Sequence, residues 1–258
     1  MSSAATAHHR KSWSAAPAGF FQAEAAGLRW LAEAEPLGGA RVVVVRAVAA
    51  DHIELTGLHP ARPAAEVAET FGRSLAVTHG MGAPAFGSPP AGWTGAAWIG
   101  RQPQANEPTP SWGEFYAEQR VRPFVRRALD RGHLDPAGAR VVESVCDRLA
   151  AGDFDDDRPP ARIHGDLWCG NVVFTADAAV LIDPAAHGGH GLTDLAMLAL
   201  FGCPGLDRIE AAYEEVAGLA RGWRELVGLH QLHPLATHAS SHGPAYAAQL
   251  VETARTFA

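Results

Sequence analysis

The spacing of apolar residues changes along the chain, and each spacing predicts one kind of element. Between residues 20 and 34 the apolar side chains recur at the spacing that places them on one face of a helix. These side chains are Phe21, Ala25, Leu28 and Ala32. β-branched residues dominate positions 41–48 and predict a strand, and residues 52–56 predict a second, shorter strand. The first part of the chain is therefore expected to combine one helix with a small sheet.

Most of the remaining chain has helical spacing. The expected helices cover approximately residues 63–79, 111–131, 136–151, 194–201, 206–217, 221–233 and 243–257. The region between residues 163 and 183 departs from this pattern, because a polar loop is followed there by two short apolar runs. The pattern therefore predicts an α+β chain whose second part is mainly helical.

The two apolar runs of this region predict a β-hairpin. Residues 172–174 and 179–182 are its expected strands, and residues 175–178 form the turn between them. Such a hairpin would return Asp183, at its end, to a position beside Asn171, at its start. Asp166 lies five positions before Asn171 on the preceding loop. The spacing therefore predicts that these three polar side chains meet at one site.

An Asp, an Asn and a second Asp at one site have the chemistry that phosphoryl transfer from MgATP requires. A carboxylate orients the attacking hydroxyl group, and an amide oxygen and a carboxylate are the hard ligands that Mg²⁺ prefers. We assign the first role to Asp166 and the metal-binding role to Asn171 and Asp183. With an ordinary pKa near 4, Asp166 would act more by positioning the hydroxyl than as a base.

Composition narrows the classes of protein. The 258 residues are 47% hydrophobic, which is enough for one large domain or two lobes with a buried core. A net charge of −7 argues against a nucleic-acid-binding protein. No apolar run is long enough to predict a membrane span, and the first ten residues lack the apolar core of a signal peptide. Three scattered cysteines predict reduced thiols in a cytoplasmic protein.

The motifs of the second half resemble one known family. They are His-Gly-Asp-Leu-Trp-Cys-Gly-Asn at 164–171, Asp-Pro-Ala at 183–185, Thr-Asp-Leu-Ala-Met at 193–197 and Leu-Phe-Gly at 200–202. Together they resemble the fructosamine kinase family, a branch of the aminoglycoside phosphotransferase and choline kinase group. The resemblance extends from about Lys11 to the C-terminus. It implies a protein-kinase-like two-lobe fold, with a nucleotide-binding lobe over 1–58 and a helical lobe with the catalytic loop and metal site over 59–258.

The resemblance also gives a role to Lys11 and Glu24. In protein kinases a strand lysine pairs with a glutamate on the following helix and aligns the ATP phosphates. Lys11 is the only lysine among the 21 basic residues, and Glu24 lies on the first expected helix. An exposed lysine and an exposed helical glutamate would be the ordinary alternative. Since residues 20–31 match the family's helix, we assign both side chains to nucleotide binding. The segment 54–58 is expected to hydrogen-bond adenine.

Three further residues are expected to support the site. His164 is expected to organise its loop by hydrogen bonding, and Asp194, at the start of a helix, to brace the same loop. Trp168 either packs against the loop or stacks on the substrate, and the resemblance favours the substrate. The family implies ATP and Mg²⁺ as cofactors and a ketosamine, free or protein-bound, as the acceptor. The oligomeric state stays open.

Two departures from the family pattern leave alternatives open. The family places two strands and a Gly-rich turn before the lysine strand, whereas ten residues precede Lys11, so a truncated N-terminal β lobe is expected. Gly191 and Leu192 occupy positions where the family usually has Arg and Glu. One alternative is an aminoglycoside- or choline-type phosphotransferase. The other is a pseudokinase that binds a ligand without transferring phosphate.

Other polar clusters are expected to carry no chemistry. The acidic stretch 153–157 lacks the glycine and closing glutamate of a calcium loop, so a solvated turn is expected. Residues 187–191 are expected to form a flexible loop because three of them are glycines. The histidines near the C-terminus lack a cysteine or acidic third ligand for zinc and are expected either to pack between helices or to lie in the substrate cleft. These histidines are His230, His233, His238 and His242.

Overall fold

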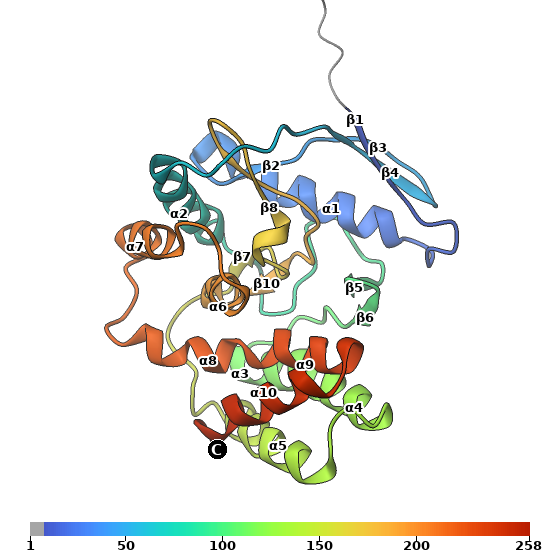
Figure 1. The fold of residues 1–258 in the computed structure, drawn as a ribbon, viewed down its shortest axis with the longest axis vertical. Helices are drawn as coiled ribbons and strands as arrows, with labels where there is room; N and C mark the ends of the chain where they lie inside the picture. Colours follow the sequence, from blue (N-terminus) through green and yellow to red (C-terminus); the bar gives the residue numbers. More distant parts are fainter. Residues whose placement is uncertain (1–7) are drawn as a thin grey trace, which may run out of the picture.

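The computed structural model describes residues 8–258 and combines small sheets with a mainly helical body, as the apolar pattern predicts (Figure 1). The first sheet and helix α1 (Phe20–Ala32) lie at one end, and helices fill the other end. The division into lobes at residue 58 stays a prediction. Two hydrophobic cores hold the described chain together. The first core joins the first sheet and α1 to the hairpin of residues 172–181, which we call the catalytic hairpin after its expected role. The second core lies between the helices of the opposite end.

The first sheet carries Lys11. Its strands are β1 (His8–Ser12), β4 (His52–Thr56) and β3 (Val45–Val48), all antiparallel, in the order β1-β4-β3. Helix α1 packs on this sheet through its buried apolar face, which includes Phe21 and Leu28. The predictions of a helix starting at residue 20 and of a strand over 52–56 are confirmed. Lys11 and Glu24 thereby lie on neighbouring elements.

The single strand predicted over 41–48 is wrong, because the run divides between two sheets. β2 (Arg41–Val42) pairs in parallel with β9 (Ala179–Leu181), and β3 pairs with β4. Between them Val43 is buried against the catalytic hairpin and Val44 is exposed. A run of β-branched residues favours extended backbone throughout, so it cannot show where the pairing partner changes. The division ties the first sheet to the hairpin.

The hairpin predicted over residues 172–182 is confirmed. β8 (Val172–Phe174) pairs antiparallel with β9, and β2 completes a sheet in the order β2-β9-β8. Thr175 closes the turn through its backbone N–H, which donates to the Ala178 carbonyl (2.7 Å). The Ile182 N–H donates to the Asn171 carbonyl (3.0 Å) and extends the pairing by one residue at the open end. This open end is where the polar loop begins.

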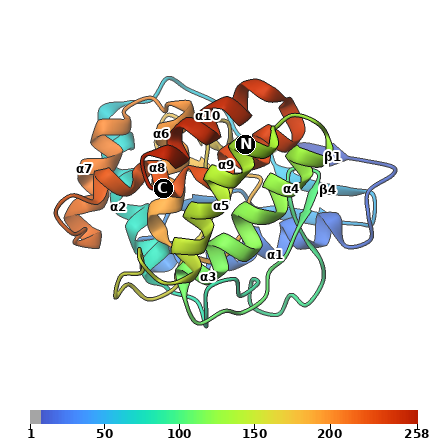
Figure 2. The same ribbon diagram turned by 90° about the horizontal axis from the view of Figure 1, so that it is seen from below.

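Helices form most of the remaining chain. They are α2 (Ala65–Gly80), α3 (Trp112–Phe115), α4 (Arg122–Asp130), α5 (Pro136–Ala150), α6 (Gly191–Phe201), α7 (Leu206–Ala217), α8 (Val227–His230), α9 (Leu232–His242) and α10 (Pro244–Arg255). A π-helical turn, Tyr116–Val121, joins α3 to α4. Figure 2 shows α4, α5, α9 and α10 side by side, and their apolar faces form the second core.

The helix predicted over 221–233 is wrong in its bounds. The chain breaks at Gln231, and α9 then runs to His242. Pro234 explains the break, since proline has no N–H for the carbonyl four residues earlier. That carbonyl, of His230, instead accepts a hydrogen bond from the Tyr116 hydroxyl (2.6 Å). A tertiary contact therefore satisfies the group that a continuous helix would have left unpaired.

The flexible loop predicted over 187–191 is also wrong. Residues His187–Gly189 form β10, a buried strand that pairs antiparallel with β7 (Ala161–Ile163). A Cβ atom on Gly188 would lie 2.2 Å from the Ala85 carbonyl oxygen, so the glycine permits close packing of two backbones. The Gly188 N–H donates to the Ser88 carbonyl (2.8 Å). Glycine therefore serves burial here rather than flexibility.

Two predicted absences of chemistry can be compared with the described chain. Residues 8–258 contain no group of three His, Cys, Asp or Glu side chains placed to hold a metal ion. In the acidic stretch, the Asp155 carboxylate accepts from the Gly113 N–H (2.7 Å) and from the Ser111 hydroxyl (2.8 Å) at the start of α3. Among residues 8–258 no helix is both long enough and apolar enough to cross a bilayer.

Candidate active site

The loop between β7 and β8 places Asp166 beside Asn171. The side-chain nitrogen of Asn171 donates to the Asp166 carbonyl (2.7 Å) and to its carboxylate (3.1 Å). It also reaches the Asp183 carbonyl (3.4 Å). Because the amide nitrogen makes these bonds, the amide oxygen is the atom that Asn171 can offer to a ligand. The loop and the end of the hairpin therefore meet as the spacing predicts.

Asp183 turns sharply at the end of the hairpin. Its φ of 53° is the one positive value among non-glycine residues in the described chain. Asp tolerates this left-handed conformation better than most residues, although it still carries a cost of about 1 kcal/mol. The turn directs the carboxylate toward the Lys11 ammonium group, which lies 2.8 Å away. Strained backbone of this kind is concentrated at functional sites.

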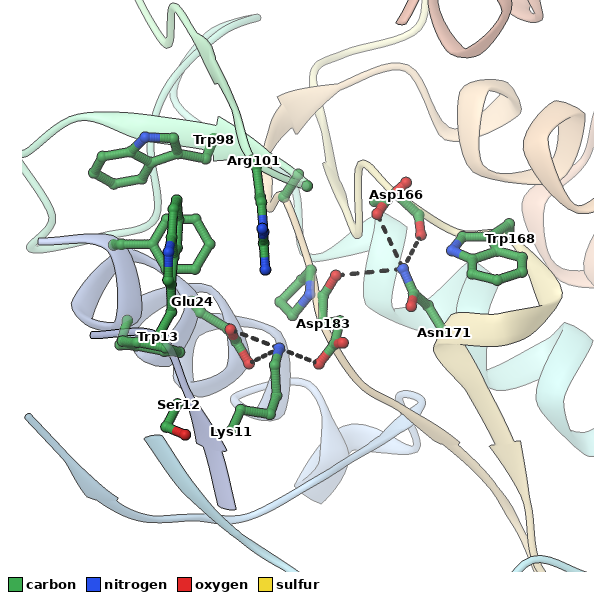
Figure 3. A pocket seen from close by; sticks show the side chains of 15 residues that line it. Lys11, Ser12, Trp13, Glu24, Trp98, Arg101, Asp166, Trp168, Asn171 and Asp183 are labelled. Atoms are coloured by element: carbon green, nitrogen blue, oxygen red, sulfur yellow. Dashed lines mark hydrogen bonds and ion pairs between the residues drawn. The ribbon is translucent and has the colours of Figure 1, made fainter. Parts of the chain in front are cut away.

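Lys11 and Glu24 form an ion pair across the sheet and α1. The Lys11 ammonium lies 2.9 Å and 3.0 Å from the two Glu24 oxygens, so it contacts two carboxylates at once when Asp183 is included (Figure 3). Burial by itself lowers the pKa of Lys11, but the two carboxylates outweigh it and the pKa is raised. Burial raises the pKa of Glu24, against the opposing effect of Lys11. Lys11 therefore stays protonated at neutral pH.

The buried Asp194 carboxylate holds the backbone of the loop that carries Asp166. Its carboxylate accepts from the backbone N–H groups of His164 (2.7 Å) and Gly165 (2.9 Å) and from the His79 ring (3.0 Å). The other ring nitrogen of His79 contacts the Tyr213 hydroxyl (2.8 Å). Burial alone would raise the pKa of Asp194, but these donors prevail and lower it. The sequence gives no signal for His79 or Tyr213, since each lies in an ordinary helix far along the chain.

His164 links the loop to the hairpin. One ring nitrogen donates to the Ile182 carbonyl (2.8 Å), and the other accepts from the Asp166 N–H (3.2 Å). The side chain is buried, and burial lowers its pKa, so the ring is neutral. A neutral ring with one donor and one acceptor nitrogen fits both bonds. His164 thus has the contacts of a structural member of the loop.

Burial changes the acidity of Asp166. It raises the pKa of this carboxyl group to about 7, and the neighbouring carboxylates of Asp183 and Asp194 add to the effect. The hydrogen bond from Asn171 opposes it. The ordinary pKa near 4 that was assumed from the sequence does not hold in the fold. A carboxyl group that titrates near neutral pH is a more effective base than an ordinary aspartate.

One cavity of about 370 Å³ is lined by Lys11, Glu24, Asp166, Asn171 and Asp183, and Figure 3 shows it. Trp168 borders it and is 43% exposed, with its ring over the Gly170 backbone and its edge near Phe201 (6.3 Å between ring centroids). Trp13 and Trp98 border the opposite side. The sequence assigns neither tryptophan a role in the site, because a single aromatic side chain is more often a packing residue.

A second cavity of about 320 Å³ adjoins Asp183 on the side of the first sheet. Its walls include Val43, Leu55 and Ile182, and its rim is the segment Thr56 to Leu58. This segment overlaps the stretch 54–58 that was expected to contact adenine.

The two cavities together fit a magnesium nucleotide. The Asn171 amide oxygen and the Asp183 carboxylate are hard oxygen donors on one side of Lys11, as Mg²⁺ requires. The Lys11 ammonium is a compact point charge of the kind that phosphate oxygens could contact. The apolar walls of the second cavity suit a base. Asp166 lies beside Asn171 in the first cavity, where an acceptor hydroxyl group could approach.

Comparison with known proteins identifies relatives along the whole described chain. The profile of the fructosamine kinase family matches residues 5–257. A probable ketoamine kinase of Synechocystis is 32% identical over 232 residues, which cover 89% of this chain and 75% of that protein. The crystal structure of a probable fructosamine-3-kinase from Thermobifida fusca shares 48% identity, with a TM-score of 0.89 over 98% of this chain and 86% of that one.

More distant structures share the fold alone. The macrolide 2′-phosphotransferase of Brachybacterium faecium aligns with a TM-score of 0.59 over 95% of this chain and 83% of that one, at 15% identity. The protein-kinase-like fold expected from the motifs is thereby confirmed. The family profile and the relatives described above confirm the resemblance on which the site assignments were based.

Proposed function

Because this chain belongs to the fructosamine kinase family, a family of phosphotransferase enzymes, we propose that it transfers phosphate from ATP to a sugar hydroxyl group of a ketosamine. One observation carries the proposal. The Lys11 ammonium contacts Glu24 and Asp183 at the edge of a cavity whose other edge holds Asp166. Phosphate-binding, metal-binding and proton-accepting groups therefore share one site.

Each of these residues acts either on the nucleotide or on the acceptor hydroxyl group. Lys11 binds phosphate oxygens, and Glu24 keeps its ammonium group in place. Asn171 and Asp183 would hold Mg²⁺, which would supply positive charge to neutralise the phosphates. Asp166 accepts the proton of the attacking hydroxyl group, and its raised pKa suits this task near neutral pH.

The supporting residues hold Asp166 in position. Asp194 accepts from the backbone N–H groups of His164 and Gly165, and His164 links the loop to Ile182. Trp168 forms the wall beside Asp166 and offers an exposed aromatic face for the sugar ring of the acceptor. Displacing the loop by about 1 Å would cost on the order of 100-fold in rate.

The first test is ATP consumption with ribulose-lysine and fructose-lysine as acceptors, with and without Mg²⁺. We expect turnover that requires both acceptor and metal and that Asp166→Asn abolishes. Asp177→Asn is the matched control, because Asp177 lies in the exposed hairpin turn. Binding of MgATP without turnover would contradict the proposal and favour a pseudokinase.

A second set of acceptors tests the ketosamine assignment. An aminoglycoside and choline are offered under the same conditions. Turnover with either of them, and none with the ketosamines, would keep the phosphotransferase activity but overturn the acceptor class. Turnover with the ketosamines alone would support the proposal.

A further inference from the structure

One cation of the catalytic cavity has no part in the proposed function. Arg101 lines the same cavity as Lys11 and Asp183, and its guanidinium group points into it (Figure 3). The side chain is exposed, and within residues 8–258 it forms no ion pair and no hydrogen bond. Lys11, in contrast, is already engaged by two carboxylates.

The backbone that carries Arg101 is fixed on two sides. Gly100 and Arg101 form the two-residue turn between β5 (Ala97–Ile99) and β6 (Gln102–Gln104), and Gly100 has the positive φ (54°) that such tight turns require. Gln102 donates to the Thr237 carbonyl of α9 (3.2 Å) and accepts from the Ser240 hydroxyl (2.8 Å). The turn is therefore anchored to the helical body.

The side chain is also oriented. Its guanidinium carbon lies 4.7 Å from the centroid of the Trp13 ring. Trp13 contacts Phe20 edge to face (5.1 Å), and Phe20 contacts Trp98 of β5 (5.4 Å). Arginine stacked on an aromatic face keeps its N–H groups free in the plane of the fork. The N–H groups of the Arg101 guanidinium are thus available to an oxyanion.

The charges of the cavity indicate which oxyanion fits. Three carboxyl groups line it, those of Glu24, Asp166 and Asp183, and the single positive charge of Lys11 is shared between Glu24 and Asp183. A triphosphate bound to Mg²⁺ brings further negative charge to the same place. A planar guanidinium fork matches two phosphate oxygens better than a point charge does. Arg101 extends into the pocket between the tryptophans Trp13 and Trp98 and the side that carries Asp183 and Asn171 (Figure 3).

We infer that Arg101 binds the terminal phosphoryl group of the nucleotide and stabilises its charge during transfer. The inference rests on the proposed function. In the transfer the bond from the terminal phosphorus to the bridging oxygen breaks, and a bond to the acceptor oxygen forms. The hydroxyl proton passes to Asp166. Arg101 gains and loses no proton, because it acts only on the negative charge of the phosphoryl oxygens.

The test compares two nucleotides that differ by this one group. Dissociation constants of MgATP and MgADP are measured by titration calorimetry, without an acceptor, for the unaltered chain, Arg101→Ala and Arg101→Lys. We expect Arg101→Ala to weaken MgATP binding about 10-fold or more, as for loss of a charge-assisted contact, and MgADP binding less than about threefold. Arg101→Lys should restore part of the preference for MgATP.

Arg224→Ala is the matched control. Arg224 also stacks on a tryptophan, Trp223, at 4.3 Å, but it lies outside both cavities described above. Its removal should leave both dissociation constants unchanged.

Two results would overturn the inference while leaving the proposed function intact. Equal weakening of MgATP and MgADP binding by Arg101→Ala would show that Arg101 only supports Trp13. Unchanged nucleotide binding with a raised KM for ketosamines that carry a free carboxylate would assign Arg101 to the acceptor. Failure of the unaltered chain to bind either nucleotide would overturn the proposed function, and the inference with it.

Discussion

Replacing Asp194 by Asn tests whether one buried carboxylate holds the catalytic loop. The substitution keeps the shape of the side chain but replaces one oxygen by an NH₂ group, which cannot accept. Asp194 accepts three hydrogen bonds, from His164, Gly165 and His79. At least one donor would then face the new NH₂ group and lose its partner in a buried site. Charge-assisted bonds of this kind are worth about 1.5–3 kcal/mol each, so we expect a loss of about 3 kcal/mol.

The assay is equilibrium unfolding in urea together with thermal unfolding. For a chain of this length a loss of about 3 kcal/mol corresponds to a fall in Tm of roughly 6–12 °C. Asp207→Asn is the control, since Asp207 lies exposed in the first turn of α7 and should change stability by less than about 1 kcal/mol. Asp194→Asn within 1 kcal/mol of the unaltered chain would refute the reasoning.

The same variant also separates bracing of the loop from general stability. Measured well below its Tm, its kcat should fall about 10- to 100-fold, because the Gly165 N–H that Asp194 holds directly precedes Asp166. An unchanged kcat with reduced stability would show that the brace serves folding alone.

Three further predictions follow from buried groups. Burial lowers the pKa of His187 and His230 far below 6.5 and that of His233 to about 3. Below pH 6.5 the unfolded chain therefore binds more protons than the folded chain, and stability decreases as the pH decreases. When the pH is lowered from 7 to 5, the free energy of unfolding should decrease by about 2 kcal/mol for each of the three histidines. Asp166 offsets part of this decrease, so the expected net loss is about 3 kcal/mol. A constant free energy of unfolding would contradict this. Gly188→Ala should destabilise the fold by about 2–3 kcal/mol in thermal unfolding, and no change would restore the flexible-loop interpretation. Tyr116→Phe should cost about 2 kcal/mol in urea unfolding by leaving the His230 carbonyl unpaired, whereas a change under 0.5 kcal/mol would show that another group replaces the hydroxyl.

The sequence predicts well what local geometry determines. The hairpin brings Asn171 and Asp183 together because a short turn and two apolar runs leave few other arrangements. The pairing of Lys11 with Glu24 was expected from the resemblance to the family, and the structure places the two on one strand and the next helix. In both cases the residues are near neighbours along the chain or on adjacent elements.

Contacts between distant elements had no such signal. His79 and Tyr213 reach Asp194 from α2 and α7, and Arg101 enters the cavity from a hairpin turn. Each is an ordinary residue in its own segment. The raised pKa of Asp166 likewise depends on burial by the whole fold, which no short motif shows.

The pairing of Lys11 also bears on the chemistry of the sugars around the protein. A reducing sugar adds to a protein through an unprotonated amine, because only the free electron pair attacks the carbonyl carbon. Lys11 is the only lysine in the sequence, and two carboxylates hold its ammonium group protonated. All other basic side chains, apart from histidine, are arginines. The chain thus presents no reactive lysine amine to the sugars whose adducts its family phosphorylates.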